Sequence, residues 1–180
     1  MRAVAVHRAE PAFTLLELLV VITILGILFA VVVPMARRSI EDSRAAVCMS
    51  NLRGLGMGLS AYLADHDMIM PTLKGGRAKL SPEEQVIDKV FQPYLKDMRV
   101  LACPSDPKYA KETGTSYYWN TALNGQHVGS LDFLRMTQEQ SKIPVASDKE
   151  GFHPYLENKV NILYADGHAT KDLKFISEPK

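Results

Sequence analysis

One apolar segment near the N-terminus constrains this chain more than any other feature. From Phe13 to Val33 every residue is apolar except Thr14, Glu17 and Thr23. As an α-helix the segment spans roughly 31 Å, close to the thickness of the hydrocarbon core of a bilayer. An ionisable residue inside such a helix is costly and is usually functional. The segment therefore predicts a membrane-spanning helix in which Glu17 needs a partner.

The residues just before this segment suggest where that partner comes from. Residues 1–12 are short and polar, which predicts a cytosolic leader. A cut between Ala12 and Phe13 would create an α-amine, which is protonated near neutral pH. This amine would lie four residues before Glu17, and it would be a salt-bridge partner for Glu17 between two parallel helices offset along their axes. Such a helix is unfavourable alone in lipid and favourable in an assembly.

The stretch 12–21 resembles the processing site and first helix of type IV pilins and type II secretion pseudopilins. In that family a membrane-embedded prepilin peptidase cuts before the Phe and N-methylates it, and the Glu guides subunit addition. The resemblance implies processing and methylation at Phe13 and identifies Glu17 as the assembly carboxylate. The family usually has Gly before the cut, whereas this chain has Ala12.

The same resemblance implies a structural function and a location. Gly26 and Pro34 match positions where helices of the family loosen in a filament. The chain would be a subunit, and not an enzyme, of a type II secretion pseudopilus or type IV pilus-like filament. Its expected partners are the prepilin peptidase, like subunits, an inner-membrane assembly platform and the lipid bilayer. The chain would cross the bacterial inner membrane once, with its N-terminus cytoplasmic and its head periplasmic, until it enters a periplasmic or extracellular filament.

Other kinds of N-terminal segment share part of this pattern. A secretory signal peptide is cut after its apolar core at an A-x-A-like site, which residues 30–36 do not offer. An ordinary signal anchor explains the length of the segment but not Glu17. The positive-inside rule, applied to Arg37, Arg38 and Arg44, favours the opposite orientation. The alternative function is a membrane-anchored periplasmic binding or catalytic domain that carries a pilin-type leader.

The helix is expected to continue beyond the membrane segment to about Ala64. Its apolar stripe consists of Cys48, Leu52, Leu55, Leu59 and Leu63. Gly54, Gly56 and Gly58 each weaken the helix by up to ~1 kcal/mol. Their spacing does not fit a phosphate loop, so close packing of the helix against a sheet is the preferred interpretation. Glu41 is placed largely off the apolar stripe.

These observations divide the chain into four parts. Residues 1–12 are the leader, 13–34 the transmembrane and assembly helix, 35–64 an amphipathic helix that packs on the head, and 65–180 the globular head.

The net charge of the chain is +1, which gives no electrostatic reason to expect a nucleic-acid partner.

The head is expected to be rich in antiparallel β-structure. Residues 115–120 and 144–147 favour strands, and an Asp-Gly pair predicts a hairpin with a two-residue turn within 160–171. Short helices are expected after a capping box at 81–84 and over 131–140. Strands that follow a long helix predict an α+β, pilin-like fold, in which the N-terminal helix packs on a small antiparallel sheet.

Cys48 and Cys103 are the two cysteines of the chain. Because the expected compartment is oxidising, a disulfide between helix and head is one hypothesis. It would stabilise the fold by up to ~4 kcal/mol. Two separate buried thiols are the equal alternative, since Cys48 lies on the apolar stripe.

The C-terminal half offers weak candidates for a metal site. His153 and Asp166-Gly167 resemble the His…Asp-Gly pattern of a prepilin-associated region, at a longer separation than usual. Some secretion pseudopilins bind calcium through loop acids, so Asp106, Asp148 and Asp166 are weak calcium candidates. No calcium-loop spacing accompanies them, and an Asp is common in a turn for backbone reasons alone. No catalytic motif is present, so neither a cofactor nor a catalytic residue is expected.

Overall fold

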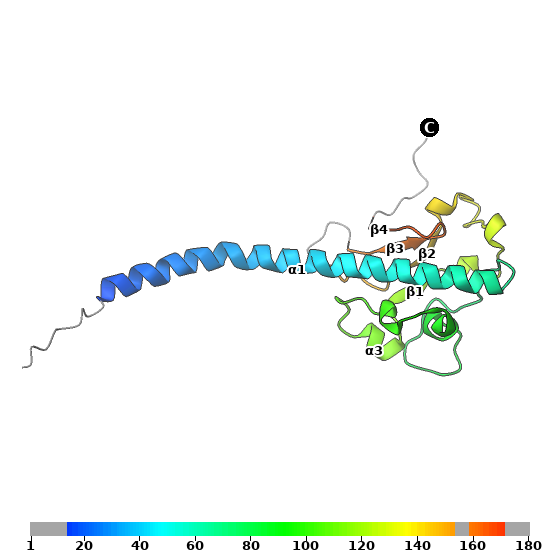
Figure 1. The fold of residues 1–180 in the computed structure, drawn as a ribbon, viewed down its shortest axis with the longest axis horizontal. Helices are drawn as coiled ribbons and strands as arrows, with labels where there is room; N and C mark the ends of the chain where they lie inside the picture. Colours follow the sequence, from blue (N-terminus) through cyan, green and yellow to red (C-terminus); the bar gives the residue numbers. More distant parts are fainter. Residues whose placement is uncertain (1–13, 154–158, 172–180) are drawn as a thin grey trace, which may run out of the picture. The chain divides into compact units, whose positions relative to one another are not determined.

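The computed structural model describes residues 14–153 and 159–171, and its longest element is helix α1 (Leu15–Asp65) (Figure 1). The chain divides into two compact units, Met1–Ser39 and Ile40–Lys180. Among the described residues, the first unit consists of the N-terminal half of α1 and the residue before it. The second unit contains the rest of α1 and the globular head.

The first half of α1 presents apolar side chains to its surroundings. The large apolar side chains between Leu15 and Val33 are 41–82% exposed. By length and composition, α1 is the one helix among the described residues that could span a membrane, and none of its most apolar window is buried. The helix continues through Pro34 without interruption. An apolar surface of this extent belongs in lipid or against other apolar helices.

The head contains a four-stranded antiparallel sheet in the order β1-β2-β3-β4. The strands are β1 (Tyr117–Trp119), β2 (Pro144–Asp148), β3 (Ile162–Tyr164) and β4 (Ala169–Thr170). In register, Tyr117 pairs with Asp148, and Ser147 pairs with Ile162. A long helix followed by a small antiparallel sheet confirms the predicted α+β fold.

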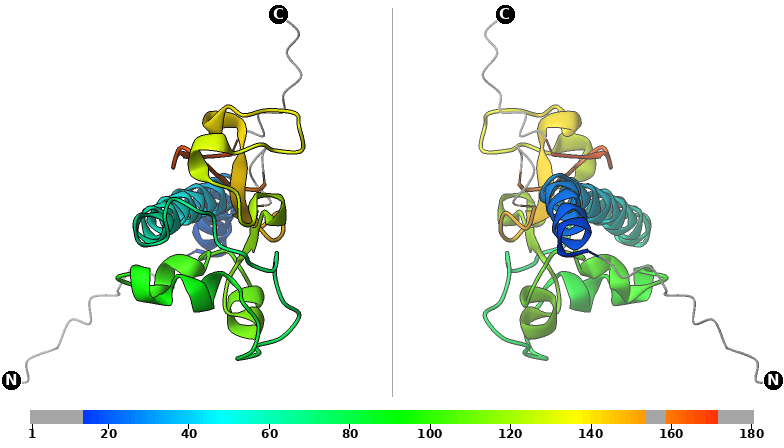
Figure 2. Two further views of the ribbon diagram at one scale, coloured as in Figure 1. Left: turned by 90° about the vertical axis from the view of Figure 1, so that its right-hand side faces the viewer. Right: turned by 90° about the vertical axis from the view of Figure 1, so that its left-hand side faces the viewer.

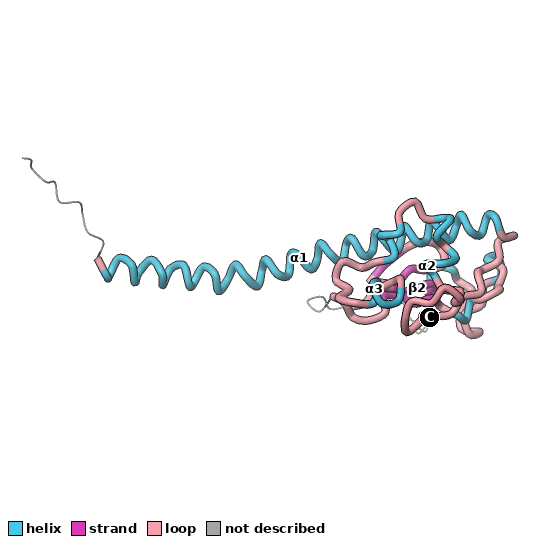
Figure 3. The backbone as a smooth tube through the Cα atoms, turned by 90° about the horizontal axis from the view of Figure 1, so that it is seen from below, coloured by secondary structure: helices cyan, strands magenta, loops and turns pink. Residues whose placement is uncertain are grey.

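Short helices and loops make up most of the rest of the head (Figure 3). They are the α-helices α2 (Ile87–Val90) and α3 (Tyr109–Thr113) and the 3₁₀ helices η1 (Gln92–Tyr94), η2 (Met98–Leu101), η3 (Thr121–Leu123), η4 (Val128–Ser130) and η5 (Gln140–Lys142). Each of these elements is too short to be stable alone, so their positions depend on packing against the rest of the head.

The second half of α1 packs on this sheet. Figure 2 looks nearly along α1 and shows the strands beside it. The five residues of the predicted apolar stripe are all buried in one core cluster: Cys48, Leu52, Leu55, Leu59 and Leu63. The sheet contributes Tyr117, Trp119 and Leu163 to the same cluster. Full burial of each leucine contributes about 1.5–3 kcal/mol, which fixes this half of the helix to the head.

The glycines of α1 allow this close approach. A Cβ added at Gly56 would lie 3.1 Å from Cδ1 of Leu163 in β3, which confirms the predicted packing against the sheet at this position. A Cβ at Gly58 would lie 2.7 Å from Cδ2 of Leu95. A Cβ at Gly54 would likewise lie 3.2 Å from Cγ1 of Val100. Gly54 and Gly58 therefore face the segment between α2 and α3, and not the sheet.

The predicted capping box at 81–84 is wrong. Helix α2 begins at Ile87, and its N-terminal flanking residue makes no side-chain hydrogen bond. The groups of the box have other partners: Arg77 Nη1 donates to the Ser81 carbonyl at 2.9 Å, and Lys74 Nζ donates to Glu84 at 2.7 Å. These contacts hold the segment in turns.

The predicted helix over 131–140 is also wrong. The Gln126 side chain donates to the Asp132 carbonyl at 3.0 Å and accepts from its N–H at 2.8 Å. Phe133 forms a β-bridge with Thr137, so the backbone turns back on itself instead of winding into a helix. Tertiary hydrogen bonds thus replace the helical ones.

The β3–β4 hairpin is present, but its turn is longer than predicted. Tyr164 N–H donates to the His168 carbonyl at 2.9 Å, which leaves three residues, 165–167, in the loop. Gly167 has a φ of 86°, a left-handed conformation that suits glycine. A three-residue loop with Gly at this position is a common hairpin connection, so the Asp-Gly pair signals a hairpin without fixing its length.

Candidate functional site

Glu17 lies in the first turn of α1 and forms a reciprocal capping box with Thr14. Glu17 Oε2 accepts hydrogen bonds from the Thr14 N–H and from Thr14 Oγ1, both at 2.9 Å. In return, the Glu17 N–H donates to Thr14 Oγ1 at 3.2 Å. The sequence pattern Thr-x-x-Glu signals this box, but the prediction considered only the new α-amine as a partner of Glu17. Within the part of the chain that the structure describes, Oε1 of Glu17 has no donor.

The other predicted assembly positions lie in the same exposed half of α1. No atom lies within 4 Å of the place where a Cβ would stand at Gly26. A neighbouring helix can therefore approach the backbone closely at this point. Pro34 has no N–H, so the Ala30 carbonyl four residues earlier lacks its usual helical donor. Ala12 and Phe13, the predicted processing residues, lie outside the described residues.

A second candidate site is a buried polar cluster in the head, which we define as Cys48, Cys103, Asp148 and His153. All four side chains are at most 4% exposed. The Cys48 thiol donates to Asp148 Oδ1 at 3.2 Å, and Cys103 Sγ lies 3.6 Å from His153 Nε2. His153 Nε2 is 3.8 Å from Asp148 Oδ2. The second half of α1, the segment before α3, strand β2 and the loop after β2 each contribute one side chain.

Further polar groups hold the members of this cluster in place. His153 Nδ1 lies 3.0 Å from Oε1 of Glu41, a residue of α1 that is 6% exposed. The same Glu41 oxygen accepts a hydrogen bond from Ser105 Oγ. Asn161 donates to Asp148 Oδ2 through its N–H at 2.8 Å and through Nδ2 at 2.9 Å. Each buried charge or dipole in the cluster is therefore oriented by a neighbour.

These contacts change the acidity of the cluster. The hydrogen bond with Cys48, together with His153, outweighs burial and lowers the pKa of Cys103 to about 6. The hydrogen bond with Cys103 and burial both raise the pKa of Cys48. Burial raises the pKa of Asp148. Burial opposes the charged form of His153, but Cys103 and Glu41 outweigh it and raise the pKa of the imidazole. The two thiols therefore differ in acidity, and Cys103 is the more acidic of the two.

The three calcium candidates have separate surroundings. Asp106 accepts hydrogen bonds from backbone N–H groups at the start of α3 and from Ser116 Oγ at 2.6 Å. Asp166 lies in the β3–β4 turn and accepts a hydrogen bond from the His168 N–H at 3.1 Å. Only Asp148 belongs to the buried polar cluster. The described contacts therefore give each of these carboxylates its own set of partners.

Both cysteines are free thiols, so the disulfide hypothesis does not describe this structure, although the two sulfurs lie close together. The residue that sequence reasoning missed is Glu41, which was placed largely off the apolar stripe and is in fact buried. Its signal was its spacing, because Glu41 precedes Cys48 by two helical turns and so lies on the same face of α1. His153, already named from the sequence among the weak candidates for a metal site, is fully buried in the cluster.

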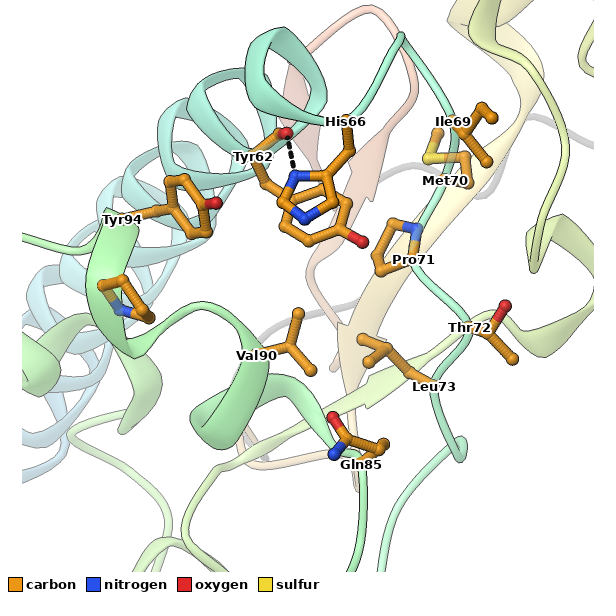
Figure 4. A pocket seen from close by; sticks show the side chains of 11 residues that line it. Tyr62, His66, Ile69, Met70, Pro71, Thr72, Leu73, Gln85, Val90 and Tyr94 are labelled. Carbon is orange, nitrogen blue, oxygen red and sulfur yellow. Dashed lines mark hydrogen bonds between the residues drawn. The ribbon is translucent and has the colours of Figure 1, made fainter.

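An open pocket of about 570 Å³ lies at the C-terminal end of α1 (Figure 4). The rings of Tyr62 and His66 stack with their centroids 3.8 Å apart, and Tyr94 stands edge-on to Tyr62. His66 Nδ1 contacts the Tyr62 carbonyl at 2.9 Å. The described lining contains one histidine and no carboxylate or thiol, so His66 has no second strong metal ligand beside it there.

The sequence is similar to a known family model and to two characterised secretion proteins. Residues 8–33 match the family model of the prokaryotic N-terminal methylation motif. Over 128 residues the chain is 32% identical to type II secretion system core protein G of Pectobacterium carotovorum subsp. carotovorum. The aligned region covers 71% of this chain and 75% of that protein. The protein of the same name from Pseudomonas aeruginosa is 32% identical over 69 residues, 38% of this chain and 49% of that protein. No solved structure matches the chain.

Proposed function

The chain belongs to the pseudopilin family of type II secretion system core protein G, and we propose that it polymerises through the first half of α1 as a structural subunit of a secretion pseudopilus. The observation that carries the proposal is the exposure of that half, whose large apolar side chains between Leu15 and Val33 are at least 41% exposed. The bilayer covers this surface before assembly. In the filament, helices of like subunits cover it.

Processing precedes assembly in this proposal. A prepilin peptidase cuts between Ala12 and Phe13 and methylates the new N-terminus, which requires a cytoplasmic N-terminus and a periplasmic head. An assembly platform in the inner membrane then adds the subunit to the filament. The match of residues 8–33 to the methylation motif supports this order of events.

Glu17 selects the position of each added subunit. Thr14 donates to Oε2 of Glu17 within the same chain, whereas Oε1 accepts no hydrogen bond from the residues that the structure describes. The α-amine of Phe13 on a neighbouring subunit supplies a donor to Oε1 and cancels the charge. Because an uncompensated carboxylate is expensive in lipid, the pair favours the assembled state over the isolated helix.

Two variants separate the assembly function of Glu17 from its capping function. Glu17→Gln keeps an acceptor for the capping box but removes the charge. We expect it to insert into the membrane and to be lost from sheared filaments and cross-linked oligomers. Thr14→Ala breaks the side-chain half of the box and keeps the carboxylate, so it should still assemble. Normal recovery of Glu17→Gln in filaments would overturn the proposal.

The intact mass of the mature protein tests the processing step. Loss of residues 1–12 together with the addition of one methyl group is the expected result in cells that contain the peptidase. An unprocessed chain in those cells would instead support the alternative function, a membrane-anchored periplasmic domain. Measuring membrane and shed fractions separately shows whether processing accompanies assembly.

A further inference from the structure

We propose that the buried polar cluster is a zinc site, in which Cys48, Cys103 and His153 bind the metal and Asp148 completes a tetrahedron. The inference concerns the head and does not depend on how α1 assembles. It assigns a ligand to side chains that assembly through the first half of α1 leaves without a role.

The spacing of the ligand atoms fits a single small cation. Tetrahedral zinc with Zn–S distances of about 2.3 Å and Zn–N distances of about 2.0–2.1 Å places its ligand atoms about 3.4–3.8 Å apart. The ligand atoms of Cys48, Cys103 and His153 all lie within 4.8 Å of one another, with Cys103 Sγ and His153 Nε2 separated by 3.6 Å. Asp148 flanks these three atoms with two different oxygens: Oδ1 accepts from the Cys48 thiol at 3.2 Å, and Oδ2 lies 3.8 Å from His153 Nε2. Small movements of these side chains would enclose the ion.

His153 is already oriented as a metal ligand. Its Nδ1 lies 3.0 Å from Glu41 Oε1, so an N–H at Nδ1 donates to this carboxylate. In the neutral tautomer that carries this proton, the lone pair resides on Nε2, the nitrogen that faces Cys103 and Asp148. A carboxylate behind a metal-binding histidine is the usual arrangement at zinc sites, because it fixes the tautomer and increases the basicity of the ring.

The chemistry of the donors selects the metal. Two sulfurs and one imidazole favour zinc over calcium or magnesium, which prefer sets of oxygen ligands. A cation would also compensate two thiolates and a carboxylate in an interior where their charges are otherwise costly. Zinc binding would displace the proton that Cys48 now donates to Asp148.

Such a site would join the second half of α1 to the head. Cys48 belongs to α1, Asp148 to β2, and Cys103 and His153 to two connecting segments. Binding at preformed ligands adds directly to the free energy of folding. Zinc and a Cys48–Cys103 disulfide are mutually exclusive states of the same two sulfurs. The proposal commits to zinc, because the site also brings together an oriented histidine and a buried aspartate, which a disulfide does not need.

The test uses the full-length chain purified in detergent, with metal content measured before and after reduction. We expect one zinc ion per chain. Replacement by Co²⁺ should give thiolate-to-cobalt charge-transfer absorption and visible bands of tetrahedral cobalt. Adding a chelator to the folded protein should remove the metal and make both cysteines, the chain's only two, accessible to alkylation.

Variants then test the assigned ligands. Cys103→Ser and His153→Asn should abolish stoichiometric zinc, and the fluorescence of Trp119, the single tryptophan, reports whether the head still folds. Glu41→Gln keeps all four ligands and should weaken zinc binding about 10–100-fold. Asp166→Asn, which changes an acid in the distant β3–β4 turn, is the matched control and should bind as the wild type does.

Three results would overturn the proposal. One is a freshly reduced wild-type chain that binds neither Zn²⁺ nor Co²⁺ through sulfur. Another is a Cys48–Cys103 disulfide, seen as an intact mass lower by two hydrogens, in protein isolated from membranes of cells grown with added zinc. The third is unchanged zinc affinity in both His153→Asn and Glu41→Gln.

Discussion

The two halves of α1 belong to one continuous helix, yet the single glutamate of each half differs in exposure and in hydrogen-bond partners. Glu17 is exposed in the first turn and is bonded to its own chain through Thr14. Glu41 is 6% exposed and contacts His153, a residue far away in the sequence. The first half is a surface that other molecules must cover, and the second half is part of a completed core. Helical structure alone therefore does not decide what a segment of α1 does. The surroundings of each helix face decide it.

The largest difference between the halves should appear on truncating a leucine. Leu52 is fully buried, so Leu52→Ala should destabilise the head by about 2–5 kcal/mol through lost contacts and a cavity. Leu25→Ala, the matched change in the exposed half, should leave that free energy unchanged. Denaturant unfolding in detergent, followed by Trp119 fluorescence, measures the head in both variants. Equal destabilisation by the two changes would contradict the division of α1 into two environments.

Neutralising each glutamate should give the next largest contrast. Glu41→Gln removes a buried carboxylate from His153 and Ser105, and should cost about 1–3 kcal/mol of head stability. Glu17→Gln should cost the head nothing and affect only assembly. The unfolding measurement is made with reductant and chelator present, so that metal binding does not enter. A Glu17→Gln head less stable than the Glu41→Gln head would reverse the comparison.

Acid should weaken the head through Asp106. Burial alone would raise the pKa of Asp106, but hydrogen bonds from Ser116 and from backbone N–H groups of α3 outweigh it and lower the pKa. A lowered pKa in the folded state stabilises the fold above the ordinary carboxyl pKa, and this contribution is lost as pH falls through the folded value. Asp106→Asn should cost about 1–3 kcal/mol at neutral pH, because an amide NH₂ replaces one of two oxygens that each accept from two donors.

The same variant should flatten the dependence of stability on pH on the acid side. Asp42→Asn, which changes an exposed acid of α1, serves as the control and should follow the wild-type curve. If Asp106→Asn and the wild type lose stability in parallel between neutral pH and the acid range, the hydrogen bonds to Asp106 do not hold the head together.

Adding one methyl group to each half should give the smallest contrast. Gly56→Ala gains up to ~1 kcal/mol of helix propensity but forces its Cβ to 3.1 Å from the buried Leu163, at a cost of about 1–3 kcal/mol. A net loss of about 1 kcal/mol is expected. Gly26→Ala meets no atom in the monomer and should not lower head stability. Stabilisation of the head by Gly56→Ala would show that α1 and the sheet are less closely packed than the structure indicates.

Much of the fold could be predicted because its signals are local. Hydrophobic spacing identified the five buried residues of the stripe, and β-branched and aromatic residues marked β1 and β2. The failures have a common cause. At 81–84 and 131–140 the sequence offers helical signals, but Arg77 and Gln126 bind the backbone groups that a helix would use. Local propensity is worth tenths of a kcal/mol per residue, so a few tertiary hydrogen bonds overrule it.

The sequence by itself determined the first half of α1, its membrane-compatible length and the processing motif around Phe13. These properties depend on consecutive residues and on their transfer from water into lipid, which need no knowledge of the rest of the chain. Only the tertiary structure decided that Cys48, Cys103, Asp148 and His153 meet, with Glu41 behind the histidine. Their convergence depends on strand register and on the path of loops between distant segments, and no periodicity along the chain encodes where such loops return.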